Sequence, residues 1–408
     1  MKMPKLKIVS ELYYPEQTST GYFLTGIAES LATSRPVNVV SVQPTYSSRG
    51  VMAPTRERRH GVDIVRSKAT SFNKDRVLGK MLNWLTVSVS IFCHLLRTLE
   101  RGEYVLVVTN PPLLPFLTAL ACRARGARYL LLIHDVYPEV LIATGKLRPD
   151  SLLAVIGRSL TGWLYRSSEH IIVLGRDMER VVVGRLVGKG APPISLIPNW
   201  GDVDRVCPTP REENALLDRL GLVDRFVVQY SGNMGRTHGL ETIVAAAARL
   251  KERAEIHFLF CGSGAKKPWL ESAVSSAALK NVTIQPSQPM AQLCDLLNGC
   301  DVAIISFMPG MAGISVPSRL YNVLAAGKPV IAVADADSEL ALVVIEEGVG
   351  WVVPPEDAER LAQTILVAQQ SRALLRSMGD KARRVAEEKY SQARVLSSYG
   401  SLMQRILR

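Results

Sequence analysis

The stretch SVPSRLYNVLAAGKPVIA, residues 315–332, decides the fold predicted for this chain. Its pattern favours a helix over 317–326, followed at once by a buried strand over 330–333. Either Ser315 or Ser318 can cap the start of the helix. A helix that leads into a wholly apolar strand is the repeating unit of a parallel sheet covered by helices, so the stretch indicates an α/β protein.

The start of this helix also indicates a chemistry. Pro317 suits the first helical position, Gly327 ends the helix, and the first backbone N–H groups have no partner within it. These groups carry the positive end of the helix dipole, and Arg319 adds a planar cation beside them. Together they can hold a diphosphate. The alternative is an ordinary helix–strand unit of a fold that binds no nucleotide.

Apolar runs alternate with helical patterns along the whole chain. Strands are predicted at 6–11, 37–42, 62–66, 104–108, 129–133, 170–174, 194–197, 226–231, 255–261, 282–285, 302–306, 330–333 and 350–353. Helices are predicted at 21–32, 77–99, 113–125, 151–166, 176–187, 239–251, 267–278, 290–299, 317–326, 338–347 and from 358 onward. The alternation predicts two doubly wound, Rossmann-like domains that face each other across a cleft.

The domain boundary is predicted near residue 200, in the stretch PNWGDVD at 198–204, because two prolines and a charged run follow it. One domain then spans 1–200 and the other spans 201–390. We expect the helix over 391–408 to cross back to the first domain. In such pairs a ligand binds at the carboxyl ends of the strands.

Composition limits the partners. The chain has 408 residues, a net charge of +12 and a pI near 9.5, so we expect a negatively charged partner. Nucleic acid is disfavoured, because zinc-finger spacing, RNP-type aromatic motifs and an arginine-rich tail are missing. The six cysteines form no CxxC pair, which favours reduced, buried thiols in a cytosolic protein and argues against a metal site.

Two polar segments of the first half follow predicted strands. Thr20 and Gly21 stand where a loop enters a helix, so Thr20 can cap the helix and Gly21 can admit a ligand. A structural turn explains them equally well. The segment HDVYPE, residues 134–139, places His134 and Asp135 at the end of an apolar strand, where ionisable groups are active-site candidates. A buried, satisfied His–Asp pair is the alternative.

Two glycine-rich loops of the second half occupy equivalent places. The loop YSGNMGRTHG, residues 230–239, indicates a phosphate cradle with Arg236 as counter-ion, or else a tight loop with a solvated arginine. The loop CGSG, residues 261–264, lets a base or ribose approach the chain, or is a plain turn.

The segment 49–80 is basic and precedes the apolar helix predicted over 77–99. Its cations are Arg49, Arg56, Arg58, Arg59, Arg66, Lys68, Lys74, Arg76 and Lys80. Basic residues beside an apolar helix that contains Trp84 and Phe92 favour contact with an anionic membrane surface. A solvated face next to a core helix is the alternative.

Taken together, these segments resemble a retaining glycosyltransferase of the GT4 family, which has the GT-B fold, and within it the WcaI/WbuB-like subgroup. The resemblance covers nearly the whole chain. It is carried by the segments YPEQTSTG at 14–21, HDVYPE at 134–139, IPNW at 197–200, SGNMGR at 231–236 and PSRLYNVLAAGKPVI at 317–331.

The resemblance implies a nucleotide-diphosphate sugar, UDP- or GDP-linked, held mainly by the second domain, with the acceptor on the side of the first. The implied catalytic residues are His134, Asp135, Arg236 and Arg319. The implied donor-binding residues are Thr20, Gly21, Gly232, Asn233, His238, Gly262, Gly313, Ser318, Leu320 and Asn322. Glu16 and Glu139 lie on the implied acceptor side. The two arginines neutralise the leaving diphosphate, no metal or cofactor is required, and attack on the same face gives retention.

The chain departs from the family pattern at three places. Where the family carries Glu-x7-Glu, this chain has Ile314 and Asn322. Asn322 can still bind ribose hydroxyls, and the sugar contact then falls to backbone groups of 310–313. His238 stands where many members have a phosphate-binding lysine.

These observations predict a cytoplasmic enzyme, peripheral at the inner face of the plasma membrane. It transfers a hexose or amino-hexose to a lipid-linked or polysaccharide acceptor of the cell envelope. One alternative is a nucleotide-sugar 2-epimerase on the same fold, which needs carboxylates as acid and base. Another is an inactive paralogue that serves as an assembly partner, because both motif glutamates are missing.

Overall fold

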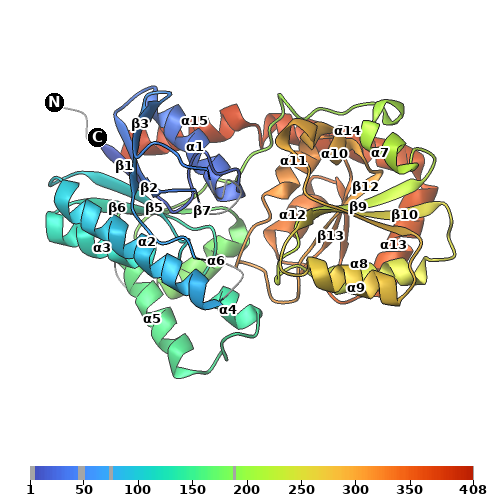
Figure 1. The fold of residues 1–408 in the computed structure, drawn as a ribbon, viewed down its shortest axis with the longest axis horizontal. Coiled ribbons are helices and arrows are strands. Elements are labelled where there is room, and N and C mark those ends of the chain that lie inside the picture. The colour runs from blue at the N-terminus through green and yellow to red at the C-terminus, as the bar shows by residue number, and fades with distance from the viewer. Residues whose placement is uncertain (1–4, 45–50, 73–76, 187–189, 408) are drawn as a thin grey trace. The chain divides into compact units, whose positions relative to one another are not determined.

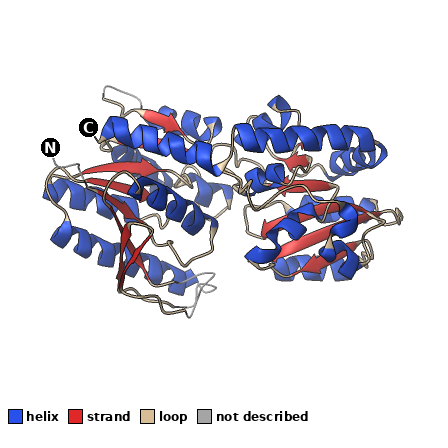
Figure 2. Cartoon of the chain, turned by 90° about the horizontal axis from the view of Figure 1, so that it is seen from above, coloured by secondary structure: helices blue, strands red, loops and turns tan. Residues whose placement is uncertain are grey.

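The computed structural model of the chain describes residues 5–44, 51–72, 77–186 and 190–407 (Figure 1). The chain divides into two compact units. The first comprises Met1–Pro198, Gly313–Ser315 and Val395–Arg408, and the second comprises Asn199–Ala312 and Val316–Arg394. In each unit helices cover both faces of one sheet (Figure 2).

The first unit contains an eight-stranded sheet, as far as the chain is described, in the order β3-β4-β2-β1-β5-β6-β7-β8. All neighbours pair in parallel except β3 and β4. The strands are β1 (Leu6–Val9), β2 (Val37–Val42), β3 (Arg56–Arg59), β4 (Val62–Ser67), β5 (Tyr104–Val108), β6 (Arg128–Leu132), β7 (His170–Val173) and β8 (Ile194–Leu196). The helices are α1 (Ser19–Ala32), α2 (Val77–Thr98), α3 (Leu114–Arg125), α4 (Glu139–Ala143), α5 (Leu152–Arg166) and α6 (Arg176–Arg185), and α15 (Gln392–Ile406) joins this unit from Val395 onward.

The second unit contains a parallel sheet in the order β11-β10-β9-β12-β13-β14. Its strands are β9 (Phe226–Asn233), β10 (Ile256–Ser263), β11 (Val282–Gln285), β12 (Val302–Ser306), β13 (Val330–Val333) and β14 (Gly350–Val353). Its α-helices are α7 (Ala215–Leu220), α8 (Leu240–Arg249), α9 (Lys267–Ser276), α10 (Leu293–Asn298), α11 (Arg319–Ala325), α12 (Glu339–Glu346), α13 (Ala358–Gln370) and α14 (Arg372–Glu388). Two short 3₁₀ turns cover Arg211–Glu213 and Met290–Gln292.

Continuous apolar strands explain both sheets. Every residue of β5 and of β13 is buried, because helices cover both faces of each sheet. Four elements were not predicted: β3, α4, α7 and the 3₁₀ turn over Arg211–Glu213. β3 consists of four charged residues at a sheet edge, so it carries no apolar signal. Buried thiols were expected, but only Cys122, Cys261 and Cys300 are buried, whereas Cys93 and Cys294 are half-buried and Cys207 is exposed.

The strand order reverses once in each sheet. In the second unit β10 lies on one side of β9 and β12 on the other, and in the first unit β2 and β5 flank β1 in the same way. Ligands of doubly wound sheets bind at this reversal, outside the carboxyl ends of the strands. This topology therefore predicts ligand contacts at two sets of loops. One set follows β9 and β12, and the other follows β1, β5 and β6.

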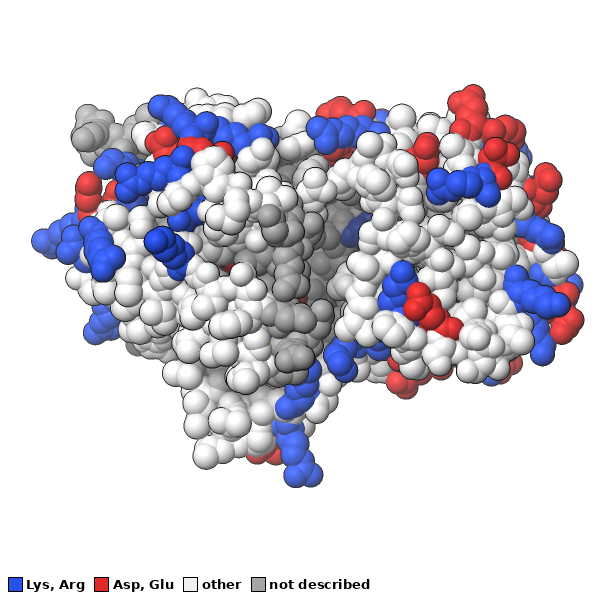
Figure 3. All heavy atoms as spheres, viewed as in Figure 1, with Lys and Arg blue, Asp and Glu red and all other residues white. Residues whose placement is uncertain are grey.

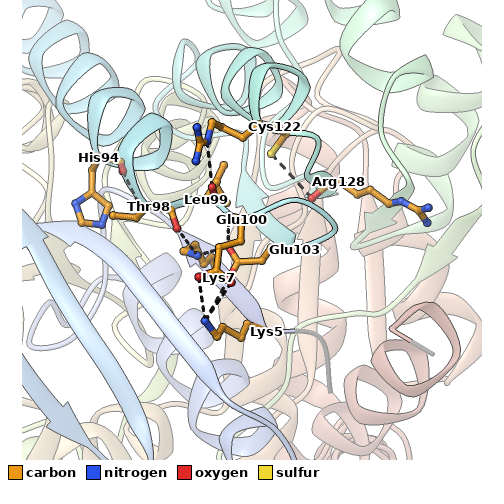
Figure 4. Close-up of polar contacts among 10 residues, drawn as sticks. Lys5, Lys7, His94, Thr98, Leu99, Glu100, Glu103, Cys122 and Arg128 are labelled. Atoms are coloured by element: carbon orange, nitrogen blue, oxygen red, sulfur yellow. Dashed lines mark hydrogen bonds and ion pairs between the residues drawn. The ribbon is translucent and has the colours of Figure 1, made fainter. Parts of the chain in front are cut away.

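At the other end of the first sheet, where β1 and β5 begin, Lys7 and Glu103 form a buried ion pair (Figure 4). Both side chains are less than a tenth exposed. Lys7 also donates to the carbonyl of Thr98 at 3.2 Å, and Glu103 accepts the N–H of Glu100 at 3.0 Å. The pair thus ties β1 and β5 to the end of α2.

Candidate active site

Arg319, the first residue of α11, is held by the end of β9 and by the loop that follows it. Its Nη1 donates to the carbonyl of Ser231 at 3.2 Å, and its Nη2 donates to the carbonyl of Asn233 at 3.4 Å and to His238 Nε2 at 3.2 Å. The guanidinium also lies over the Tyr230 ring, 4.8 Å from its centroid. The two segments that the sequence singled out separately therefore meet at the β9–β12 reversal.

Arg319 keeps an uncompensated charge. Within the described residues no carboxylate forms an ion pair with it, because its partners are carbonyls and a neutral ring. The side chain is half-buried, so it is fixed and still reachable. A fixed, unpaired cation is what binds a phosphate oxygen well.

His238 is buried and neutral. Its Nδ1 lies 3.2 Å from the carbonyl of Ser306, and its ring stacks on Phe307 with centroids 5.3 Å apart. Burial lowers the pKa of His238 to about 3, and the positive charges of Arg319 and Lys266 act in the same direction.

Glycines bring the loops together. Gly232 has φ +130°, and a Cβ there would lie 3.2 Å from Arg319 Cζ, so a side chain would push the guanidinium away. Gly262 has φ +152°, and its Cβ would lie 1.9 Å from the carbonyl oxygen of Gly232. The last residues of β9 and β10, where Gly232 and Gly262 are strand partners, are thus in direct backbone contact, and only glycine allows it.

Two further cations lie near this loop. Arg236 is exposed and makes no hydrogen bond or ion pair with the rest of the described chain. Lys266, which the sequence analysis missed, donates to the His238 carbonyl at 3.0 Å and pairs with Glu241 at 2.7 Å. Its position in the sequence just after the 261–264 loop could have identified Lys266 as a candidate.

Helix α11 differs from the prediction. It begins at Arg319 rather than at Pro317, and Ser318 makes no capping hydrogen bond to it in the described structure. The sequence indicated an anion site at the start of this helix. Because α11 is only seven residues long, its dipole adds little to such a site. Leu320 is fully buried and its N–H donates to Pro317, so neither group is available to a ligand. The side chain of Arg319, rather than the helix end, supplies the positive charge.

The loop before α11 was also predicted differently. Its N–H groups were expected to contact the sugar, but those of Gly310, Met311 and Ala312 donate to the Asp335 carboxylate at 3.3, 2.9 and 3.1 Å. The N–H of Gly313 donates to Asp177 at 2.8 Å within the first unit. These four donors are therefore occupied by carboxylates of the protein.

Asn322 and Ile314, which replace the motif glutamates, have structural partners. Asn322 Oδ1 accepts the N–H of Asp202 at 2.8 Å, so the expected ribose contact is not open to that oxygen. Ile314 is buried, and its carbonyl accepts the N–H of Val136 at 3.0 Å.

His134 and Asp135 follow β6 in the first unit, and both backbone N–H groups donate to Thr109 Oγ1. Asp135 pairs with Ser315, and burial raises the pKa of its carboxyl. His134 Nε2 is buried without a hydrogen-bond partner among the described residues, and burial lowers the pKa of the ring to about 4. The alternative of a satisfied His134–Asp135 pair is therefore not what the described residues show.

The remaining first-unit candidates have structural contacts. Thr18, not Thr20, caps α1 by accepting the N–H of Gly21 at 3.3 Å. A Cβ on Gly21 would lie 2.7 Å from the carbonyl oxygen of Glu16, so the close approach of the loop requires glycine here, and Glu16 is buried. Glu139 forms ion pairs with Arg158 and Arg185.

Two negative findings concern the described residues. They contain no group of three or more His, Cys, Asp or Glu side chains that could hold a metal ion. None of their helices combines the length and apolar character needed to cross a membrane.

Known proteins match both the sequence and the fold. A family model described as "Glycosyl transferases group 1" matches residues 216–385. The chain is 30% identical over 410 residues to the probable glycosyltransferase WbjE of Pseudomonas aeruginosa, with 99% of each chain covered. It is 28% identical to the putative colanic acid biosynthesis glycosyl transferase WcaI of Escherichia coli K12, covering 97% of this chain and 98% of the relative.

Solved structures share the architecture at low identity. Sucrose-phosphate synthase from Thermosynechococcus elongatus superposes with a TM-score of 0.78 at 18% identity, covering 99% of both chains. Anabaena HepE, solved in complex with UDP-glucose, gives 0.72 at 14% identity, covering 98% of this chain and all of the other. With the sequence relatives, these matches show that the chain belongs to the group 1 glycosyltransferases and is a glycosyltransferase of the GT-B fold.

Proposed function

We propose that this glycosyltransferase moves a hexose or amino-hexose from a UDP- or GDP-linked sugar to a hydroxyl of a lipid-linked or polysaccharide acceptor, in cell-envelope glycan synthesis. The observation that carries the proposal is Arg319, a fixed cation that has no carboxylate partner in the described part of the chain and lies at the reversal of the second sheet. The named roles of the relatives in colanic acid synthesis and the UDP-glucose bound to HepE support the acceptor and donor classes.

In the proposed reaction the bond between the anomeric carbon and the diphosphate oxygen breaks, and a bond to the acceptor oxygen forms on the same face. The acceptor proton passes to the leaving diphosphate. Arg319 and the exposed Arg236 neutralise the charge that develops on that group, which is the service a metal gives elsewhere. We propose that no metal ion is needed, so excess chelator leaves the transfer rate unchanged. His134, with its unpartnered Nε2, is the proposed contact to the donor sugar.

A thermal-shift screen with UDP- and GDP-sugars tests the donor proposal. A donor at a hundred times its dissociation constant stabilises the protein by about 2.7 kcal/mol, which raises the melting temperature measurably. The hit is then incubated with and without acceptor, and the product is analysed by NMR. Retained anomeric configuration is expected. An altered sugar nucleotide formed without acceptor identifies an epimerase, and binding without turnover identifies an inactive partner.

We also propose that the first unit rests on an anionic membrane surface. Apolar side chains of α2 and α5 are exposed, and the face that Figure 3 shows over these helices is largely uncharged. They are Leu78, Met81, Leu82, Leu85 and Val89 on α2, and Leu152, Leu153, Val155, Ile156 and Leu160 on α5. Exposed Lys146 and Arg148 precede α5, and Lys80 lies over the Trp84 ring. Of the predicted cations, Arg49, Lys74 and Arg76 lie outside the described residues.

The cations of the first unit predict that membrane binding depends on lipid charge and on salt concentration. Binding to vesicles that contain phosphatidylglycerol is expected to exceed binding to neutral vesicles and to fall as salt is raised. If the same share of the protein stays in the soluble fraction with phosphatidylglycerol vesicles and with neutral vesicles, this part of the proposal is rejected.

A further inference from the structure

The orientation of Arg319 depends on one side chain. Two of its three acceptors are backbone carbonyls, of Ser231 and Asn233, and these are fixed by the end of strand β9. The third is His238 Nε2, 3.2 Å from Arg319 Nη2. Replacing His238 removes an acceptor that no other described side chain supplies to the guanidinium.

The contacts of His238 require one tautomer. A guanidinium only donates, so Nε2 must accept the hydrogen bond from Arg319. The carbonyl of Ser306 only accepts, so Nδ1 must carry the proton. The neutral Nδ1–H form satisfies both contacts. A protonated ring would direct a second N–H at Arg319 and would bring two cations together.

The surroundings hold the ring in this form. Phe307 stacks on one face and Tyr230 meets it edge-on, and the residue is 8% exposed. The charged groups that face it are both positive: Arg319 from α11, and Lys266 from the segment before α9, whose ammonium is also paired with Glu241. Burial and these charges disfavour protonation.

We propose that His238 is a positioning residue, whose neutral imidazole aims the Arg319 guanidinium at the donor diphosphate without contacting the donor itself. The inference rests on the proposed donor site. It replaces the expectation, drawn from the family resemblance, that His238 binds phosphate in the place of the lysine of many members. A lysine ammonium here would face Arg319 and could accept no hydrogen bond from it.

Two matched variants separate the two contacts of the ring. In His238→Gln the amide oxygen reaches the place of Nε2 and still accepts from Arg319. In His238→Asn the shorter amide can serve only the Ser306 carbonyl. We expect Gln to bind UDP or GDP, measured by calorimetry, within about threefold of wild type, and Asn to bind about tenfold more weakly, the cost of one hydrogen bond to a charged group. Melting temperatures of both variants show whether the fold is retained.

A double-mutant cycle shows whether His238 acts through Arg319. In the Arg319→Ala background, His238→Asn is expected to change nucleotide affinity by less than about twofold, because the residue it positions is missing. A merely structural role would weaken binding by the same factor in both backgrounds, and that result overturns the inference.

A second measurement needs no ligand. In protein labelled with ¹⁵N-histidine, the signal that disappears in His238→Gln should be that of a neutral Nδ1–H ring that does not titrate between pH 5 and 8. An Nε2–H tautomer, or a midpoint near the ordinary value of 6.5, overturns the geometry on which the inference stands.

The outcomes also separate this inference from the proposed function. If the wild type binds neither UDP nor GDP, the donor site is rejected, and with it any role of His238 in aiming Arg319 at a donor. If the wild type binds and His238→Asn binds equally well, the donor site stands and the positioning role is rejected.

Discussion

Asp335 shapes the loop before α11. Its carboxylate accepts three successive N–H groups, those of Gly310, Met311 and Ala312, and the acid lies at the end of β13. We predict that Asp335→Ala leaves these donors without their acceptors and loosens the loop at a cost of about 1–3 kcal/mol. Hydrogen exchange of the three amides should become faster, whereas Asp337→Ala, two residues on and exposed, should leave it unchanged. Equal protection in both variants would contradict this assignment.

At the scale of single residues, the sequence predicts some contacts and misses others for a physical reason. Gly232 lies at the end of β9 and Arg319 in the segment after β12, and these strands are neighbours in a doubly wound sheet, so topology brings the two residues together. The partners of Asp335 and Asn322 depend on how a loop folds over a few ångströms, and no periodic pattern records that. The buried, neutral state of His238 was missed for the same reason.

At the scale of elements, the Lys7–Glu103 pair holds β1 and β5 to the end of α2 (Figure 4). Lys7→Met removes the buried partner of Glu103 and leaves only the longer contact to Lys5 at 4.0 Å, so we predict a loss of about 3 kcal/mol in unfolding free energy by urea titration. The double variant with Glu103→Leu should regain most of it. A single variant as stable as wild type would show that the pair is unimportant.

The exposed apolar rows of α2 and α5 give a second prediction at this scale. Leu153→Glu on α5 and Leu85→Glu on α2 each place a carboxylate where the proposal puts lipid. Each should reduce flotation with phosphatidylglycerol vesicles several-fold, while Gln363→Glu, exposed on α13 of the other unit, adds the same charge without effect. Comparable losses in all three variants would indicate a general charge effect rather than a docking face.

Element boundaries show where sequence patterns succeed. The apolar strands and long amphipathic helices lie close to their predicted bounds, because burial on both faces of a sheet leaves a continuous apolar signal. The strand β3 carries only charged residues, and the start of α11 depends on tertiary contacts of residues 315–318, so local propensity could not locate either. The exposed apolar row on α5 was missed because, in a sequence, an apolar helix face that is exposed has the same pattern as one that is buried in the core.

At the scale of the whole molecule, the three histidines whose pKa values are lowered most contribute to the response to acid. Burial lowers the pKa of His134 and of His257 to about 4 and that of His238 to about 3. Below about pH 6.5 the unfolded chain takes up protons that the folded chain refuses, so stability falls as pH falls, by up to about 1.4 kcal/mol per pH unit for each histidine. The denaturant concentration at the unfolding midpoint should be lower at pH 5 than at pH 7. The difference between the two pH values should be smaller in His238→Gln than in wild type. Midpoints that do not change with pH would contradict these burial assignments.

The central claim is that Arg319 carries the charge of the departing diphosphate, and the most direct measurement is kcat/KM for transfer by Arg319→Ala. Arg372→Ala, an exposed arginine at the start of α14, is the matched control. The account predicts a loss of about a hundredfold or more for Arg319→Ala, with the melting temperature kept and the control unaffected. Equal kcat/KM in the two variants would contradict it.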